Sequence, residues 1–211
     1  MILVWVGGAL SGSSFDTLLA SFSHRWGSTN LQKFDAWRKL IESGAGSGEA
    51  DRLKSVNEFF NRQITFGEDM AIWGQPDYWA TPLETLGKGA GDCEDFVIAK
   101  YFSLQMVGVS ADKLRLVYVN ARTGTSGVAA SQAHMVLAYF PRPDAEPLLL
   151  DNLIGDIRPA SRRPDLSPVF SFDRRGIFSA AGGQQIAPAV GAGRLSRWED
   201  LLRRAVAEGF E

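Results

Sequence analysis

The sequence has few of the residues that most often carry metal or redox chemistry. Among its 211 residues are one cysteine, Cys93, and two histidines, His24 and His134. A single cysteine excludes an internal disulfide framework, and so small a Cys/His set leaves almost no basis for a structural zinc cluster. A mechanism that needs a thiol must therefore use Cys93, and one that needs an imidazole must use one of the two histidines.

An excess of one charge and a long apolar run are also missing. The formal net charge is −2, with 22% charged residues, which is typical of neither a disordered chain nor a general nucleic-acid binder. The apolar run at residues 1–10 is shorter than the roughly 20 residues that span a bilayer. With 45% hydrophobic residues, the chain is long enough for one domain with a sizeable core, or one domain and a small appendage.

Residues 1–28 have two interpretations. The apolar run is followed by a Ser/Gly-rich stretch, as in a secretory signal peptide with its cleavage site, but no basic residue precedes Arg25. A signal peptide begins with a positively charged region, so this segment is either a truncated signal peptide or an N-terminal extension. In the second case, we expect residues 1–10 to form a strand or an apolar tail folded onto the core.

Helical patterns dominate the first half of the chain. Apolar residues recur at helical spacing over 30–42, 49–62 and 93–107. Asn30 is placed to cap the first of these helices, and a Gly/Ser break at 43–48 separates it from the second.

Two capping boxes mark further helix starts. Thr81 and Glu84, with a proline at the first helical position, predict a short helix after an irregular aromatic stretch at 64–80. Ser196 and Glu199 predict the start of an amphipathic C-terminal helix.

Strand patterns fill most of the second half. Apolar runs bounded by turn residues predict strands at 114–120, 134–140, 147–153 and 168–172. A long Gly-rich loop at 121–131 joins the first two strands. Helices followed by antiparallel strands predict an α+β fold. We therefore expect a domain over 29–178, followed by a linker of small residues and the last helix over 179–211.

Cys93 follows a Gly-Asp corner and lies in the first turn of a predicted helix. A helix N-terminus has free N–H groups and a positive dipole end, which favour a thiolate and can stabilise an oxyanion. We therefore expect a lowered thiol pKa. The alternative is that Cys93 is an inert, buried thiol.

His134 begins an apolar strand, and Asp151 ends the next apolar run, where a carboxylate is costly to bury without hydrogen bonds. Taken singly, the histidine can be a core residue and the aspartate a turn residue. Together with Cys93 they supply a nucleophile, a base and an acid that orients the base. Adjacent antiparallel strands can place His134 and Asp151 side by side.

Three carboxylates, Asp92, Glu94 and Asp95, surround the thiol. Negative neighbours oppose thiolate formation, and a hard dication with oxygen ligands, such as calcium, would neutralise them. Alternatively, these side chains only cap the first helical turn. The residues alone leave both interpretations open.

Several segments resemble the bacterial transglutaminase-like cysteine proteinases over about residues 30–178. They are Asp77-Tyr78-Trp79-Ala80-Thr81-Pro82, Gly89-Ala90-Gly91-Asp92-Cys93-Glu94-Asp95-Phe96, Ala133-His134-Met135-Val136-Leu137 and Leu150-Asp151-Asn152. The resemblance implies a papain-like core in the transglutaminase arrangement. It also implies Cys93 as nucleophile, His134 as base and Asp151 as its orienting group, with calcium at Asp92, Glu94 and Asp95.

The same resemblance implies a biological setting. It implies a periplasmic endopeptidase that cleaves the N-terminal region of a large repeat adhesin and so controls biofilm attachment. It further implies a LapD-like inner-membrane receptor that sequesters the protease when cyclic di-GMP is abundant. Two alternatives remain: a protein-glutamine acyltransferase that uses the same thioester, and an inert transglutaminase-like binding domain.

Two other features have less specific interpretations. Trp79, upstream of the nucleophile, is either a core residue or a contributor to the oxyanion site or substrate groove. A group of arginines is expected to be a solvated face and no nucleic-acid site: Arg158, Arg162, Arg163, Arg174 and Arg175. His24 is expected to be structural or exposed.

Overall fold

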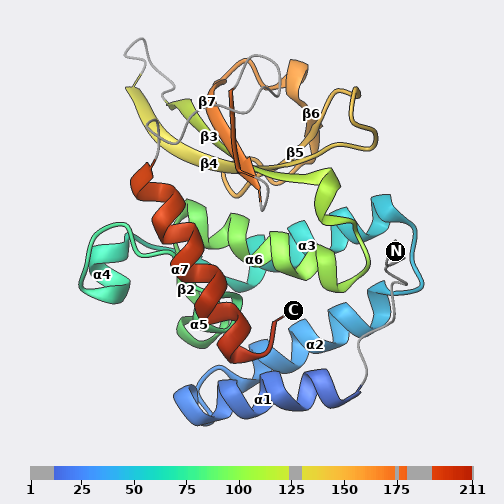
Figure 1. The fold of residues 1–211 in the computed structure, drawn as a ribbon, viewed down its shortest axis with the longest axis vertical. Helices are drawn as coiled ribbons and strands as arrows, with labels where there is room; N and C mark the ends of the chain where they lie inside the picture. Colours follow the sequence, from blue (N-terminus) through green and yellow to red (C-terminus); the bar gives the residue numbers. More distant parts are fainter. Residues whose placement is uncertain (1–11, 124–129, 174–175, 180–191, 211) are drawn as a thin grey trace, which may run out of the picture.

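The computed structural model describes residues 12–123, 130–173, 176–179 and 192–210. A group of helices forms one layer, and an antiparallel sheet covers it (Figure 1). The helices come first in the chain and the sheet follows, apart from the last helix. The α+β prediction is therefore confirmed.

The helices are built around buried faces at helical spacing. They are α1 (Gly12–Trp26), α2 (Leu31–Gly44), α3 (Glu49–Gln63), α4 (Asp69–Trp73), α5 (Pro82–Lys88), α6 (Cys93–Met106) and α7 (Ala192–Glu208). In α2, for example, Phe34, Trp37 and Ile41 are buried along one side, as expected of an amphipathic helix on a core. Short 3₁₀ turns occur at Ala111–Lys113 and Ala160–Arg162.

Six strands form the main sheet, in the spatial order β6-β5-β4-β3-β7-β8. Their bounds are β3 (Leu114–Thr123), β4 (Ala130–Tyr139), β5 (Leu148–Leu150), β6 (Arg158–Pro159), β7 (Leu166–Asp173) and β8 (Gly176–Ser179). All neighbouring pairs are antiparallel. A separate parallel pair joins β1 (Thr65–Phe66) to β2 (Ala90–Gly91), directly before α6.

Helix α6 is the central element. It packs against β4 and β3 of the sheet on one side and against α3 and α5 on the other. Residues 95–104 are all buried, because a helix between two layers has no solvated face. The position of α6 fixes where its first residue, Cys93, meets the sheet.

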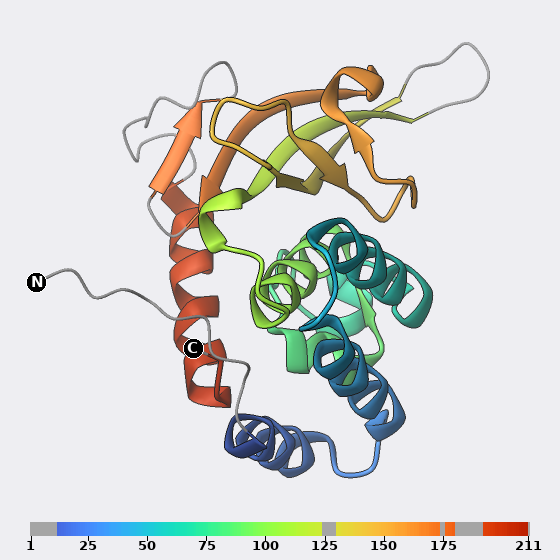
Figure 2. The same ribbon diagram turned by 90° about the vertical axis from the view of Figure 1, so that its right-hand side faces the viewer.

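The terminal helices complete the same core. Phe15, Leu18 and Phe22 of α1 and Trp198 and Leu201 of α7 belong to the main hydrophobic cluster. In Figure 2, α7 runs along one side of the molecule, from the sheet to α1. Both helices are therefore integral to the packing of the described chain.

Two predicted caps are wrong. Asn30 has a left-handed backbone (φ 54) and no capping hydrogen bond; its side-chain amide instead donates to the carbonyl of Gly87 at 3.0 Å. Ser196 lies inside α7, which begins at Ala192. By contrast, the capping box of Thr81 and Glu84 is present.

Some predicted loops contain regular structure. Helix α2 continues to Gly44 and so includes the start of the break that was expected at residues 43–48. Strand β3 continues to Thr123 and β4 begins at Ala130, so the expected loop at 121–131 is partly strand. The stretch 64–80 contains β1 and α4, and α1 was not expected. The interpretations of residues 1–10 and of most of the linker fall outside the described residues.

Across the described ranges, none of the helices combines the length and the apolar character that crossing a membrane requires.

Candidate active site

Cys93 is the first residue of α6. Asp92 before it is extended (φ −97, ψ −165), so the chain turns from β2 into the helix at this point. A Cβ atom built on Gly91 would lie 2.7 Å from the Cβ of Asp95, so a larger residue there would force the strand away from the first helical turn. Glycine thus allows the close approach that places Cys93 under the sheet.

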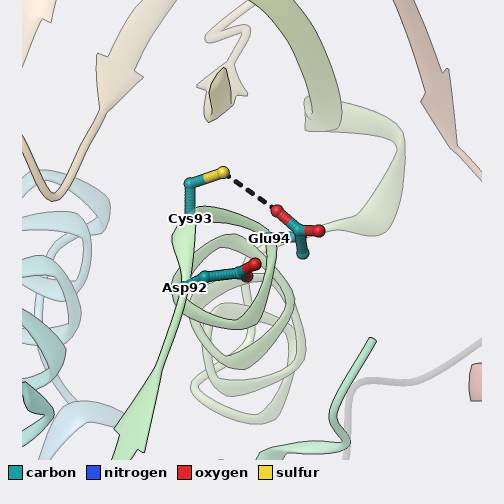
Figure 3. A group of neighbouring side chains, drawn as sticks. All are labelled: Asp92, Cys93 and Glu94. Atoms are coloured by element: carbon teal, nitrogen blue, oxygen red, sulfur yellow. Dashed lines mark hydrogen bonds between the residues drawn. The ribbon is translucent and has the colours of Figure 1, made fainter. Parts of the chain in front are cut away.

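The thiol of Cys93 lies between Glu94 and strand β4. Its Sγ donates to Oε2 of Glu94 at 2.9 Å (Figure 3). A backbone hydrogen bond from Met135 also acts on the sulfur. Because Met135 directly follows His134 in β4, the fold brings the thiol to the part of the strand that carries the histidine.

His134 and Asp151 are in direct contact. Nε2 of His134 lies 2.8 Å from Oδ1 of Asp151, and the two residues are 2% and 1% exposed. Strand β5, in which Leu150 pairs with Leu137 of β4, ends just before Asp151. The predicted adjacency of these two strands is therefore confirmed, and Nδ1 of His134 is left for other contacts.

Asp151 accepts hydrogen bonds at both carboxylate oxygens. Oδ1 also accepts from the backbone of Leu153 at 3.0 Å, and Oδ2 accepts from Nη2 of Arg163 at 2.7 Å. Burial raises the pKa of Asp151, but the hydrogen bonds and charge of His134, with those of Leu153 and Arg163, outweigh burial and lower it to about 2. The carboxylate is thus held ionised in the interior.

The expectation that the arginines form a solvated face is wrong for Arg163. Its side chain is 1% exposed and bonded to Asp151 and Asp165, whereas Arg162 beside it is exposed as expected. Arg174 and Arg175 lie outside the described residues. No sequence pattern distinguished Arg163, because its partner Asp151 is reached through the path of the chain and not through helical or strand spacing.

The carboxylates around α6 form a cluster. Oxygens of Asp69, Asp92 and Asp95 lie within 4.8 Å of one another, as do ligand atoms of Asp92, Cys93 and Glu94. Asp69, the first residue of α4, was not singled out from the sequence because it lies far upstream of Cys93. The tertiary fold adds it to the three acidic residues that the sequence indicated.

Helix capping explains only part of this cluster. Asp95 accepts from the backbone N–H groups of Ala80 at 2.8 Å and Asp92 at 3.4 Å, and Asp69 accepts from the backbone of Tyr78 at Oδ2. Oδ1 of Asp69 and Oδ1 of Asp92 are buried with no hydrogen-bond partner among the described residues. Two carboxylate oxygens therefore remain for a cation.

The surroundings of Cys93 act against the lowered pKa that the helix dipole predicted. Burial raises the pKa of the thiol, and Glu94 and Asp92 raise it further through charge and hydrogen bonding. Burial and mutual repulsion also raise the pKa of Asp92 and Asp95 and that of Asp69 to about 6. The helix dipole is outweighed because desolvation and two carboxylates, those of Glu94 and Asp92, act on the thiol.

Trp79 is a core residue. It is 2% exposed, its ring stacks on Phe172 with a centroid distance of 5.6 Å, and its Nε1–H donates to Asp77 at 3.0 Å. The core interpretation is therefore confirmed. His24 lies exposed on α1.

The comparisons with known proteins agree with this geometry. The sequence model of the bacterial transglutaminase-like cysteine proteinase family matches residues 38–164. Three structures of LapG from Legionella pneumophila are similar over most of both chains. One is 37% identical, covers 91% of this chain and 97% of that chain, and has a TM-score of 0.74.

The other two LapG structures differ in their treatment with metal. The calcium-bound form is 36% identical over 90% of this chain and 98% of that chain, with a TM-score of 0.75. The EGTA-treated form is 36% identical over 91% and 97%, with a TM-score of 0.76. No curated protein sequence gives a significant match. By the family match and by its likeness to LapG, the chain belongs to the bacterial transglutaminase-like cysteine proteinases.

Proposed function

We propose that the chain is a calcium-dependent cysteine endopeptidase in which Cys93 is the nucleophile, His134 the base and Asp151 the group that orients the base. One observation carries the proposal: Nε2 of His134 lies 2.8 Å from Oδ1 of Asp151 in the interior. The next residue of the same strand, Met135, donates a backbone hydrogen bond to the Cys93 thiol. Family membership supports the same chemistry.

The proposed mechanism gives each group a step. When Nε2–H of His134 donates to Asp151, Nδ1 is free to accept the proton of Cys93. The thiolate then attacks the peptide carbonyl carbon, and N–H groups at the start of α6 stabilise the oxyanion. His134 returns the proton to the leaving amine. It then takes a proton from water, and the water oxygen attacks the thioester carbonyl carbon. The released Cys93 thiolate takes that proton from His134, which restores the thiol.

Calcium fits the carboxylate cluster. Asp69, Asp92, Glu94 and Asp95 supply the hard oxygen ligands that calcium prefers, and two of their oxygens are buried without a partner among the described residues. When bound, the ion supplies positive charge that offsets the carboxylates raising the pKa of Cys93. The existence of a calcium-bound LapG structure supports this assignment.

The resemblance to LapG extends the proposal to a biological role. We place the protein in the periplasm, where it would cleave the N-terminal region of a large surface adhesin and thereby control biofilm attachment. A LapD-like inner-membrane receptor of cyclic di-GMP would sequester it.

The proposal is tested with Cys93→Ala on a recombinant N-terminal fragment of a large repeat adhesin. We expect no cleavage, and a change in the free energy of unfolding of less than about 1 kcal/mol, because a half-buried thiol contributes little packing. His134→Ala should be equally inactive, whereas His24→Ala, at the exposed histidine of α1, should retain full activity.

Cleavage by the Cys93→Ala variant would contradict the proposal. A reaction with added putrescine separates hydrolysis from acyl transfer. If mass spectrometry finds the amine on substrate glutamines and no cut chain, the activity is that of an acyltransferase.

A further inference from the structure

We infer that Arg163 is a positioning residue of this site, which fixes the Asp151 carboxylate and through it the orientation and tautomer of the His134 imidazole. The inference rests on the proposed function, since it concerns the histidine that serves as base. It assigns a role to a residue that the sequence placed on a solvated face.

The contacts of Arg163 converge on two carboxylates. Nη2 donates to Oδ2 of Asp151 at 2.7 Å and to Oδ2 of Asp165 at 2.7 Å, and Nε donates to Asp165 at 3.0 Å. Asp165 keeps about a third of its side chain exposed, whereas the side chains of Arg163 and Asp151 are 1% and 0% exposed. The partly exposed Asp165 therefore fixes the position of the guanidinium, and the guanidinium in turn fixes the position of the buried Asp151 carboxylate.

The path of the chain places Arg163 there. After β5, the chain pairs back along it as β6, passes through the 3₁₀ turn at Ala160–Arg162 and returns to Asp151. The backbone N–H of Arg163 donates to Ala160 at 3.0 Å, and the carbonyl of Asp165 accepts from Arg122 of β3 at 2.8 Å. Arg163 thus connects the end of β5 to the start of β7, two strands that are not neighbours in the sheet.

Stability is a poor explanation for this arrangement. Burying two charges costs several kcal/mol per ion, and their attraction often repays no more than that cost. Nη1 of Arg163 is also buried without a partner among the described residues, which adds an unsatisfied donor. A purely structural role would be served as well by apolar side chains, so the arginine is better explained by what it does to Asp151.

The consequence for His134 follows from proton positions. Because Arg163 donates to Oδ2, that oxygen cannot carry a proton without losing the contact, and Asp151 remains an acceptor. Oδ1 then requires a proton on Nε2 of His134, which leaves Nδ1 unprotonated and able to accept the thiol proton. A neutral Asp151 could instead donate to Nε2, and the ring proton would then sit on Nδ1, the wrong tautomer for a base.

A lysine is not equivalent at this position. The planar guanidinium uses Nε and Nη2 together and so fixes the direction of its hydrogen bond to Asp151, whereas an ammonium is a point charge on a flexible stem. Arg163→Lys keeps the charge and removes the fork. Arg163→Gln removes both, and Arg162→Gln, at the exposed neighbouring arginine, is the matched control.

The test measures the tautomer of His134 by NMR. Two histidines in the chain give two sets of ring ¹⁵N signals, which His24→Ala assigns. In the calcium-loaded full chain at pH 8, we expect wild type and Arg162→Gln to show the Nε2–H tautomer for His134, and Arg163→Gln to show a mixture with Nδ1–H. With the adhesin fragment, kcat should fall at least roughly tenfold, as for residues that orient a reacting group, while KM stays within about twofold of wild type.

Wild-type ring signals and kcat in a folded Arg163→Gln variant would overturn the inference. If that variant does not fold, Arg163→Lys decides: a partial shift in tautomer and a lower kcat support the inference, and wild-type values overturn it, since charge alone would then suffice. The proposed function fails separately, if His134→Ala retains activity. An inactive His134→Ala beside a fully active Arg163→Gln would contradict only the role of Arg163.

Discussion

Asp151 shows how a single residue can keep a charge inside the protein. Its carboxylate is enclosed, but each oxygen has donors, one from a backbone amide and the others from His134 and Arg163. An unpaired carboxylate in the same place would take up a proton. The charge of Asp151 is therefore a property of its three neighbours, and it is sensitive to the loss of any one of them.

The stability of the protein at acid pH should depend on the ionisation of Asp151. The pKa of Asp151 is lowered in the folded state from 3.8 to about 2. A lowered carboxyl pKa adds stability above the unfolded-state value, and that stability is lost as pH falls from about 4 towards 2. We expect wild type to lose about 2 kcal/mol more than Asp151→Asn between pH 5 and pH 2, measured by urea unfolding at each pH.

The exposed Asp144 provides the control for this experiment. Asp144→Asn should follow the wild-type dependence on pH, because that carboxyl group has no buried partner whose contact depends on its charge. Parallel curves for wild type and Asp151→Asn would mean that Asp151 is not ionised through contacts made on folding.

At the scale of elements, the start of α6 combines two opposed effects. The helix dipole favours an anion at Cys93, but the capping residue and the first turn bring carboxylates that burial makes expensive to ionise. Burial and the charges of Glu94 and Asp92 also raise the pKa of the Cys93 thiol, against the effect of the dipole. The calcium ion that we propose at this cluster would offset these opposing charges.

Calcium should reverse the pH dependence of this element. Carboxyl groups whose pKa is raised on folding stabilise the protein at low pH, and that contribution is lost as pH rises, through about 6 for Asp69. With EGTA, we therefore expect the melting temperature to fall between pH 5 and pH 8. Added calcium should raise it at pH 8 by mass action, whereas magnesium should do so poorly. Differential scanning calorimetry measures both effects.

Asp92→Asn separates a metal ligand from a cap. Asparagine caps a helix as well as aspartate does. The variant should therefore melt higher than wild type in EGTA at pH 8, because a buried carboxyl group that is costly to ionise is gone, yet it should show no shift with calcium. Asp51→Asn, at an exposed first-turn carboxylate of α3, should keep the full calcium shift. A calcium shift of the melting temperature in Asp92→Asn as large as that of wild type would mean that the carboxylate is only a cap.

At the scale of the whole molecule, the terminal helices lie outside the family match but contribute to the same hydrophobic core. The match spans residues 38–164, whereas α1 and α7 lie outside it. Trp198 of α7 contacts the rings of Tyr101 in α6 and Phe172 in β7, with centroid distances of 5.5 and 5.7 Å. One side chain of α7 thus joins α6, the helix that begins with Cys93, to the sheet.

Trp198→Ala should therefore destabilise the entire fold. The side chain is 1% exposed, and removing a buried tryptophan costs roughly 3–5 kcal/mol. Val206→Ala, on the exposed side of the same helix, should change the free energy of unfolding by less than about 0.5 kcal/mol. Urea unfolding compares the two, and a loss below about 1 kcal/mol for Trp198→Ala would make α7 a dispensable appendage.

The sequence by itself determined the features that depend on neighbouring residues. Helical spacing predicted α2, α3 and α6, the capping box predicted α5, and apolar runs predicted the central strands. Cys93, His134 and Asp151 could be singled out because Cys93 lies at a predicted helix start and the other two lie beside apolar runs that predict strands; in the structure His134 is inside β4 and Asp151 directly follows β5. Local periodicity and capping chemistry are sufficient for such predictions.

Only the tertiary structure decided the features that depend on distant contacts. Arg163 and Asp69 joined the site through the path of loops that no periodicity describes. The pKa of Cys93 is raised where the dipole predicted a fall, because burial and the positions of Glu94 and Asp92 depend on how α6 packs. Asn30 donates to Gly87 and does not cap α2. Desolvation and long-range pairing are properties of the packed molecule, so residue order alone leaves them undetermined.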